Sequence, residues 1–210
     1  MSVRDTSARR IPDPAAGTSR NRTAHDPSRP LIWQRTDTVG TELVFPDADG
    51  RTAAGSAVIG GTGPHSVHWL AALDDDGGVR GLTLTCESAQ SSGTLTMSRE
   101  DDGTLVFRTR DAADDTGTIR LPGVEVVRVT DSPMFVTWAM RRLRLAPAKG
   151  VVAAVTARIL LPSLTVATGT STYQLVSDRR LRIGGDEAAT VFDLNEAGIV
   201  SYRPGRLRLA

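Results

Sequence analysis

The sequence predicts an all-β protein built from a single curved antiparallel sheet, of the kind described as a spiral β-roll or half-barrel. From Leu31 onward, short runs of alternating apolar and polar residues recur, and this alternation is the period of a half-buried strand. Turn sequences rich in Asp and Gly separate these runs. Apolar residues do not keep the spacing of three and four that a helix requires, so we expect no helix. About a dozen short strands joined by tight turns must form a sheet that curls on itself.

The first half of the chain supplies the clearest strand and hairpin signals. Two strands are expected at Leu31–Arg35 and Glu42–Phe45, with Trp33 anchoring the core. The buried faces of two further strands are predicted by alternating residues, namely Val67, Trp69, Ala71 and Leu73, and Leu82, Leu84 and Cys86. Tight turns are expected at Asp47–Gly50, Asp74–Gly78, Glu100–Gly103 and Asp114–Gly117. We interpret them as hairpin turns and not as calcium loops, because Asp74–Gly78 lacks the later glutamate of an EF-hand.

The second half continues the strand pattern, with one ambiguous segment. Strands are expected at Val124–Val129, Val151–Leu161, Tyr173–Val176, Leu181–Ile183, Thr190–Leu194 and Ile199–Tyr202. Val151–Leu161 contains enough alanine to tolerate a helix, but its Val, Thr and Ile residues favour a strand.

Length and composition limit the classes of protein that the chain can belong to. The chain has 210 residues, and we expect one domain over residues 30–210 after a polar, disordered segment at residues 1–29. The net charge of +1 does not indicate nucleic-acid binding, which requires a clearly basic domain. No apolar run is long enough for a secretory signal or a membrane span, so we expect a cytoplasmic protein. Cys86, the single cysteine, excludes an internal disulfide and is expected to be a buried, inert thiol.

The segment Ser132–Leu145 concentrates large apolar side chains and then three arginines. We interpret its second half as a strand, because Leu143 and Leu145 alternate with arginines. Arg141 then falls on the face of the leucines, where a cation is costly unless it is paired or hydrated. Two interpretations stay open. The segment is either a core strand entered through an apolar loop, or the edge of an apolar cavity beside a cation, which suits an amphiphile with an anionic or sugar head.

No set of residues indicates catalysis, a resident metal or a cofactor. His65 and His68 are the two histidines of the predicted domain, and three residues apart on a strand they face opposite sides. Gly60–Gly63 is not followed by the Lys-Ser/Thr of a phosphate-binding loop. Gly169–Tyr173 lacks the pattern of a nucleophile elbow. We therefore expect a protein that is not an enzyme and holds neither a metal nor a cofactor.

Short motifs carry a resemblance to a known family over the predicted domain. They are Trp33, Ser132-Pro133 with Arg141-Arg142-Leu143, and Asp193 with Gly198-Ile199-Val200 and Pro204-Gly205. On these residues the chain resembles the bacterial family of putative glycolipid-binding proteins, which implies a spiral β-roll comparable with bacterial lipid carriers. Two positions depart from the family pattern, since Ala139 stands in place of a proline and Arg203 separates Tyr202 from the following Pro-Gly.

The predicted sheet and the resemblance together lead to a binding hypothesis. A strongly curved sheet can leave a hollow on its concave side, and such hollows commonly hold ligands. We expect non-catalytic binding of a lipid, a glycolipid or a similar amphiphile there. The residues expected at the site are Trp69, Phe135, Trp138 and Met140 as an apolar wall, with Arg141 near the mouth.

Two functions from other classes stay open. A small-molecule enzyme could use Glu42, Glu87 or Glu125 in the same hollow as a general base, because burial raises the pKa of a carboxyl group. Two carboxylates converging in an apolar pocket would support that function. A protein-interaction module could instead pair through an exposed edge of the sheet, and its first test is the oligomeric state.

Overall fold

The computed structural model describes residues 29–111, 116–185 and 189–210 of the chain. The disordered segment predicted for residues 1–29 lies outside the described residues, apart from Arg29. The first two residues of the predicted turn Asp114–Gly117 also lie outside them. Within the described ranges the all-β prediction is confirmed, since fifteen strands form one curved, open sheet accompanied by short helical segments.

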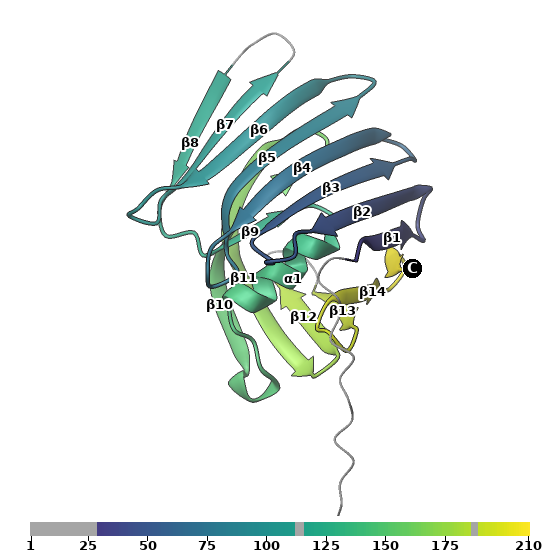
Figure 1. The fold of residues 1–210 in the computed structure, drawn as a ribbon, viewed down its shortest axis with the longest axis vertical. Coiled ribbons are helices and arrows are strands. Elements are labelled where there is room, and N and C mark those ends of the chain that lie inside the picture. The colour runs from purple at the N-terminus through teal and green to yellow at the C-terminus, as the bar shows by residue number, and fades with distance from the viewer. Residues whose placement is uncertain (1–28, 112–115, 186–188) are drawn as a thin grey trace, which may run out of the picture.

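The strands lie in the order β8-β7-β6-β5-β4-β3-β2-β1-β15-β14-β13-β12-β11-β10-β9 (Figure 1). The first half comprises β1 (Leu31–Arg35), β2 (Gly40–Pro46), β3 (Thr52–Ile59), β4 (His65–Leu73), β5 (Val79–Ser88), β6 (Ser92–Arg99), β7 (Leu105–Asp111) and β8 (Thr116–Leu121). The second half comprises β9 (Val126–Val129), β10 (Val151–Leu160), β11 (Thr165–Ser177), β12 (Arg180–Gly184), β13 (Thr190–Leu194), β14 (Val200–Arg203) and β15 (Leu207–Leu209). The ambiguous segment Val151–Leu161 is thus a strand, as predicted.

Two meanders run along this sheet and meet at its middle. Strands β1 to β8 pair in chain order toward one edge, and β10 to β15 return in chain order until β15 pairs with β1. The β1–β15 pair is antiparallel and sets Trp33 opposite Leu209. At the other edge β9 pairs with β10 in parallel, which departs from the predicted antiparallel sheet. The reason is the helical connection between these two strands, since a crossover of this kind lets the chain re-enter a sheet in the same direction.

The connection between β9 and β10 contains the helix α1 (Pro133–Arg142) and a short 3-10 turn, η1 (Pro147–Lys149). The predicted strand in the second half of Ser132–Leu145, and the prediction that no helix forms, are therefore wrong. Ser132 is the N-cap residue, and Pro133 occupies the first turn, where its fixed φ suits a helix. This Ser-Pro pair is the sequence signal that favours a helix start at this point.

The strand prediction failed because residues 133–140 of α1 do not alternate between a buried and an exposed face. Every residue from Pro133 to Met140 is buried, so the helix has no polar face along most of its length. The alternation of leucine and arginine falls at the helix end, where Leu143 is the C-cap residue. Arg141 is exposed and does not share the buried side of Leu143, contrary to the prediction.

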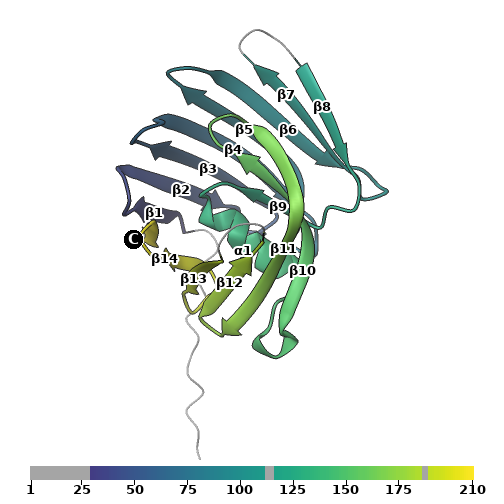
Figure 2. The ribbon, with the colours of Figure 1, turned by 180° about the vertical axis from the view of Figure 1, so that it is seen from behind.

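Helix α1 occupies the concave side of the sheet, between the two meanders (Figures 1 and 2). Its Phe135 and Trp138 meet Trp69 of β4 in mutual edge-to-face contacts, with ring centroids 4.9 to 5.7 Å apart. Gly55 of β3 makes room for the Trp69 indole, because a Cβ added at Gly55 would lie 2.1 Å from the ring. The hollow of the sheet is therefore largely filled by the helix, and openings remain at the margins of α1.

The buried faces and turns of the first meander match their predictions. The alternating residues of β4 and β5 are buried, including Cys86. The predicted turns after β2, β4 and β6 all form, and Gly50, Gly77 and Gly103 close them with positive φ. This conformation strains residues with a Cβ, which explains why glycine ends each turn sequence.

Candidate functional site

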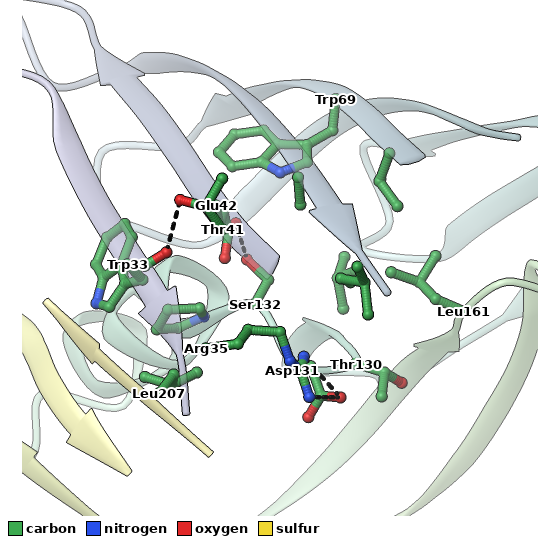
Figure 3. Close-up of a pocket in the computed structure, with 15 residues that line it drawn as sticks. Trp33, Arg35, Thr41, Glu42, Trp69, Thr130, Asp131, Ser132, Leu161 and Leu207 are labelled. Atoms are coloured by element: carbon green, nitrogen blue, oxygen red, sulfur yellow. Dashed lines mark hydrogen bonds and ion pairs between the residues drawn. The ribbon is translucent and has the colours of Figure 1, made fainter. Parts of the chain in front are cut away.

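An apolar pocket opens beside the start of α1, between the first meander and the loop that leads into the helix. Its apolar wall is formed by Trp33, Ala57, Ile59, Val67, Trp69 and Leu161. The pocket encloses about 410 Å³, including space open to solvent. An apolar wall with few polar groups is the usual composition of a small-molecule site. We call this site the apolar pocket (Figure 3).

A carboxyl group, Glu42 of β2, is buried in the apolar pocket. The hydroxyl Oγ of Ser132 donates a hydrogen bond of 2.6 Å to Glu42 Oε1 (Figure 3). Burial raises the pKa of Glu42 to about 7, although hydrogen bonds from the side chains of Ser132 and Trp69 act in the opposite direction. The protonation state of Glu42 therefore changes near neutral pH.

Ion pairs form the polar rim of the apolar pocket. Asp131 bridges two arginines, since its Oδ2 lies 3.3 Å from Arg35 and its Oδ1 accepts a hydrogen bond of 2.9 Å from Arg203. Arg35 also pairs with Asp37 at 2.9 Å, and hydrogen bonds from Arg35 and Arg206 lower the pKa of Asp37 to about 2. Asp131 has a φ of 61°, a left-handed conformation that aspartate tolerates better than most residues. The rim thus offers both donors and acceptors at fixed positions.

A second pocket lies on the other side of Asp131. It is lined by Arg128 of β9, Arg158 of β10 and Arg203 of β14, together with hydroxyl groups and glycine backbone, and it encloses about 820 Å³ including open space. Residues 129–131 line both pockets, so the two sites adjoin along this short segment. We call the second site the arginine pocket.

A third opening lies along one face of α1, beside Met134, Trp138 and Arg141. Leu31, Ala53 and other residues of the sheet complete it, and it encloses about 400 Å³ including open space. Among the residues that the structure describes, Arg141 forms no ion pair, so its charge is free at this opening. We call this site the Arg141 opening.

Comparison with known proteins places the chain in a family. The family described as "Putative glycolipid-binding" matches residues 30–208. The chain belongs to this family. A crystal structure of a DUF1089 family protein from Pseudomonas aeruginosa has a similar fold, with a TM-score of 0.56 and 18% sequence identity over 98% of this chain and 97% of that chain. No curated protein matches the chain.

Part of the motifs that predicted membership of this family lies at the apolar pocket. Trp33 lines it and donates a hydrogen bond of 2.7 Å from Nε1 to the carbonyl oxygen of Val200. Thr137 of α1 accepts a hydrogen bond of 3.2 Å from the backbone N–H of Val200. Ser132 and Pro133 also line the pocket. The family motifs therefore hold α1, β1 and β14 together where the pocket forms.

The residues predicted for the site are distributed over two openings and the core. Trp69 lines the apolar pocket, whereas Trp138 and Arg141 line the Arg141 opening. Phe135 and Met140 are buried, and Phe135 packs against both tryptophans. The structure thus joins the three aromatic rings but does not arrange the five residues around one hollow.

Several charged residues of the site were not identified from the sequence. They are Arg35, Arg128, Asp131 and Arg203. Arg128 interrupts the apolar run of β9, and a cation among valines is a signal that could have indicated it. The other three come from distant segments, and no local pattern brings them together.

The other candidate groups for chemistry lie apart from the pockets. Of the three glutamates considered for catalysis, Glu42 is buried, whereas Glu87 and Glu125 are exposed. His68 is exposed and contacts Ser56. Within residues 29–111, 116–185 and 189–210 no group of three or more His, Cys, Asp or Glu side chains could hold a metal ion. No helix in these ranges has the length and hydropathy to cross a membrane.

Proposed function

We propose that this member of the family binds an amphiphile, such as a lipid or glycolipid, without changing it chemically. The observation that carries the proposal is the apolar pocket, whose wall of aromatic and aliphatic side chains ends at the ion-paired rim around Asp131. An alkyl chain gains free energy by leaving water for such a wall. The rim supplies the donors and acceptors that the hydroxyl groups of a sugar head can use.

The fixed geometry of the rim supports a site that is formed before ligand arrives. The Arg35 side chain is 8% exposed and is held by Asp37 and Asp131. Side chains that are already ordered lose little entropy when a ligand binds, so more of the contact energy appears as affinity. The family description agrees with an amphiphilic ligand.

Binding can be tested with dodecyl maltoside below its critical micelle concentration. Trp33 and Trp69 line the apolar pocket, so the intrinsic fluorescence should change as the alkyl chain enters. We expect a saturable change and, by native mass spectrometry, one ligand per chain. The absence of saturable binding, together with the absence of any lipid in organic extracts of the purified protein, would refute the proposal.

Two alanines of β3 provide a matched pair that locates the site. Ala57 lines the apolar pocket and Ala53 lines the Arg141 opening, and both are buried on the same face of the strand. Ala57→Leu should fill the apolar pocket and weaken binding of dodecyl maltoside, whereas Ala53→Leu should leave it unchanged. The reverse result would move the ligand to the Arg141 opening. Thermal melts of both variants control for overpacking, which typically costs about 1–3 kcal/mol.

A small-molecule enzyme is a second candidate, favoured by the carboxyl groups of Glu42 and Asp131 in one pocket. A pKa of about 7 suits Glu42 to general-base chemistry near neutral pH. Asp131 forms ion pairs with two arginines, so it would position a ligand and would not act as a base. Mass spectrometry of the amphiphile after incubation with the protein tests this candidate. A product that forms with the wild type and not with Glu42→Gln would support catalysis, and an unchanged amphiphile would support binding alone.

A further inference from the structure

The arginine pocket contains Arg128, a cation that pairs with no carboxylate among the described residues. The Nε atom of Arg128 is fully buried and has no hydrogen-bond partner. The side chain of Tyr173, whose hydroxyl lies 3.1 Å from Thr156 Oγ1, acts to raise the pKa of Arg128. In the part of the chain that the structure describes, Arg128 forms no ion pair. A partly buried cation of this kind opposes folding unless another group compensates its charge.

The register of the strands adds positive charge beside Arg128. Arg158 is the direct partner of Arg128 in the parallel β9–β10 ladder, and Arg203 lines the same pocket. Like charges at neighbouring positions of a sheet repel each other. Burial, followed by the charges of Arg203 and Arg158, lowers the pKa of Arg128. Asp131, which also lines the pocket, is shared between Arg203 and Arg35 and does not pair with Arg128.

We propose that the arginine pocket binds an oxyanion, such as a phosphate, sulfate or carboxylate group, in the head of the amphiphile whose tail occupies the apolar pocket. This inference rests on the function proposed above. The guanidinium group of Arg128 presents N–H donors in a planar arrangement that matches an oxyanion. An oxyanion beside Arg128 would also compensate the charge of its guanidinium group.

The arrangement of the two pockets suits one molecule with a head and a tail. Val129, Thr130 and Asp131 line both sites, so the two pockets are neighbours along this segment. The hydroxyl groups of Thr130, Thr170 and Ser171 line the arginine pocket and can contact the remaining polar atoms of a head group. The ligand class is therefore an anionic amphiphile, with or without a sugar.

Three probes separate the contributions of head and tail: dodecyl phosphate, dodecyl maltoside and inorganic phosphate. We expect wild-type protein to bind dodecyl phosphate about 10- to 100-fold more tightly than dodecyl maltoside. This ratio of affinities corresponds to the free energy of one charge-assisted hydrogen bond. Arg128→Met should abolish this preference and keep the affinity for dodecyl maltoside. Without ligand its melting temperature should equal or exceed that of the wild type, because the uncompensated cation is gone.

Two further variants keep the test decisive. Arg128→Lys keeps the charge without the planar donors, so it should retain part of the preference even if Arg128→Met does not fold. Arg182→Met removes an exposed arginine of β12, next to Ile183 of the arginine pocket but on the opposite face, and should retain the whole preference.

The possible outcomes distinguish this inference from the proposed function. If dodecyl maltoside binds and dodecyl phosphate binds no more tightly, or if Arg128→Met keeps the preference, the inference is refuted and the proposed function stands. If inorganic phosphate binds as tightly as dodecyl phosphate, the pocket takes a free oxyanion and the link to the apolar pocket is refuted. If no dodecyl compound binds and organic extracts of the purified protein contain no lipid, the proposed function itself fails.

Discussion

Glu42→Gln tests whether a carboxyl group in the apolar pocket opposes folding when it ionises. Glu42 is buried, and loss of hydration raises its pKa from 4.5 to about 7. At about 1.4 kcal/mol for each tenfold change in proton affinity, this difference corresponds to about 3 kcal/mol. The folded state binds the proton more tightly than the unfolded state does. The stabilising contribution of protonated Glu42 is therefore complete below pH 4.5 and is lost as the pH rises through 7.

Glutamine keeps an oxygen that can accept the hydrogen bond from Ser132, but it carries no charge at any pH. We expect Glu42→Gln to exceed the free energy of unfolding of the wild type by less than about 1 kcal/mol at pH 5 and by up to about 3 kcal/mol at pH 8. That gain corresponds to roughly 6–12 °C in melting temperature for a domain of this size. Urea unfolding of both proteins from pH 5 to pH 8 measures the difference directly.

The control variant is Glu87→Gln, which removes an exposed carboxylate from β5 and so accounts for the change in net charge. If the stability difference between Glu42→Gln and the wild type stays constant over this pH range, the ionisation of Glu42 is not linked to folding. A variant that loses stability at pH 8 would show that the ionised carboxylate is stabilised in the pocket, and the reasoning from burial would be wrong.

Two further substitutions test the packing around α1. Arg141→Met should keep or raise the melting temperature, because Arg141 has no ion pair among the described residues, whereas a locked salt bridge would cost about 3–5 kcal/mol on substitution. Gly55→Ala should destabilise by about 1–3 kcal/mol in urea, because the added Cβ would lie 2.1 Å from the Trp69 ring. Gly81→Ala is its control, since the nearest atom lies 3.8 Å away, and equal unfolding midpoints for the two alanine variants would contradict the predicted clash.

The sheet could be predicted from the sequence because its signals are local. Alternation identified the buried faces of β4 and β5, and the Asp-Gly turn sequences marked where hairpins reverse. Helix α1 escaped the same reasoning because burial on all sides removes the polar face that identifies a helix. The spacing of polar residues identifies a helix only where one of its faces contacts water, and residues 133–140 of α1 have no such face.

The candidate site could be predicted only in part, because it is assembled over long separations in sequence. The sequence indicated that Trp69 is buried and that Glu42 is a candidate for a buried carboxyl group. It could not indicate that Asp131 lies between Arg35 and Arg203, which are 96 and 72 residues away along the chain. The charge of the site depends on that convergence, which follows from the order of the strands and not from any motif.

The pairing of β1 with β15 at the middle of the sheet has a consequence for how the chain folds. Most neighbouring strands are also neighbours in sequence, so their hairpins close short loops and can form early. The β1–β15 pair instead joins Trp33 to Leu209 and must close a loop of almost the whole domain. Folding is therefore expected to proceed as two local processes followed by one late joining step. Because Trp33 and Leu207 line the apolar pocket, that pocket is completed only when the two halves have joined.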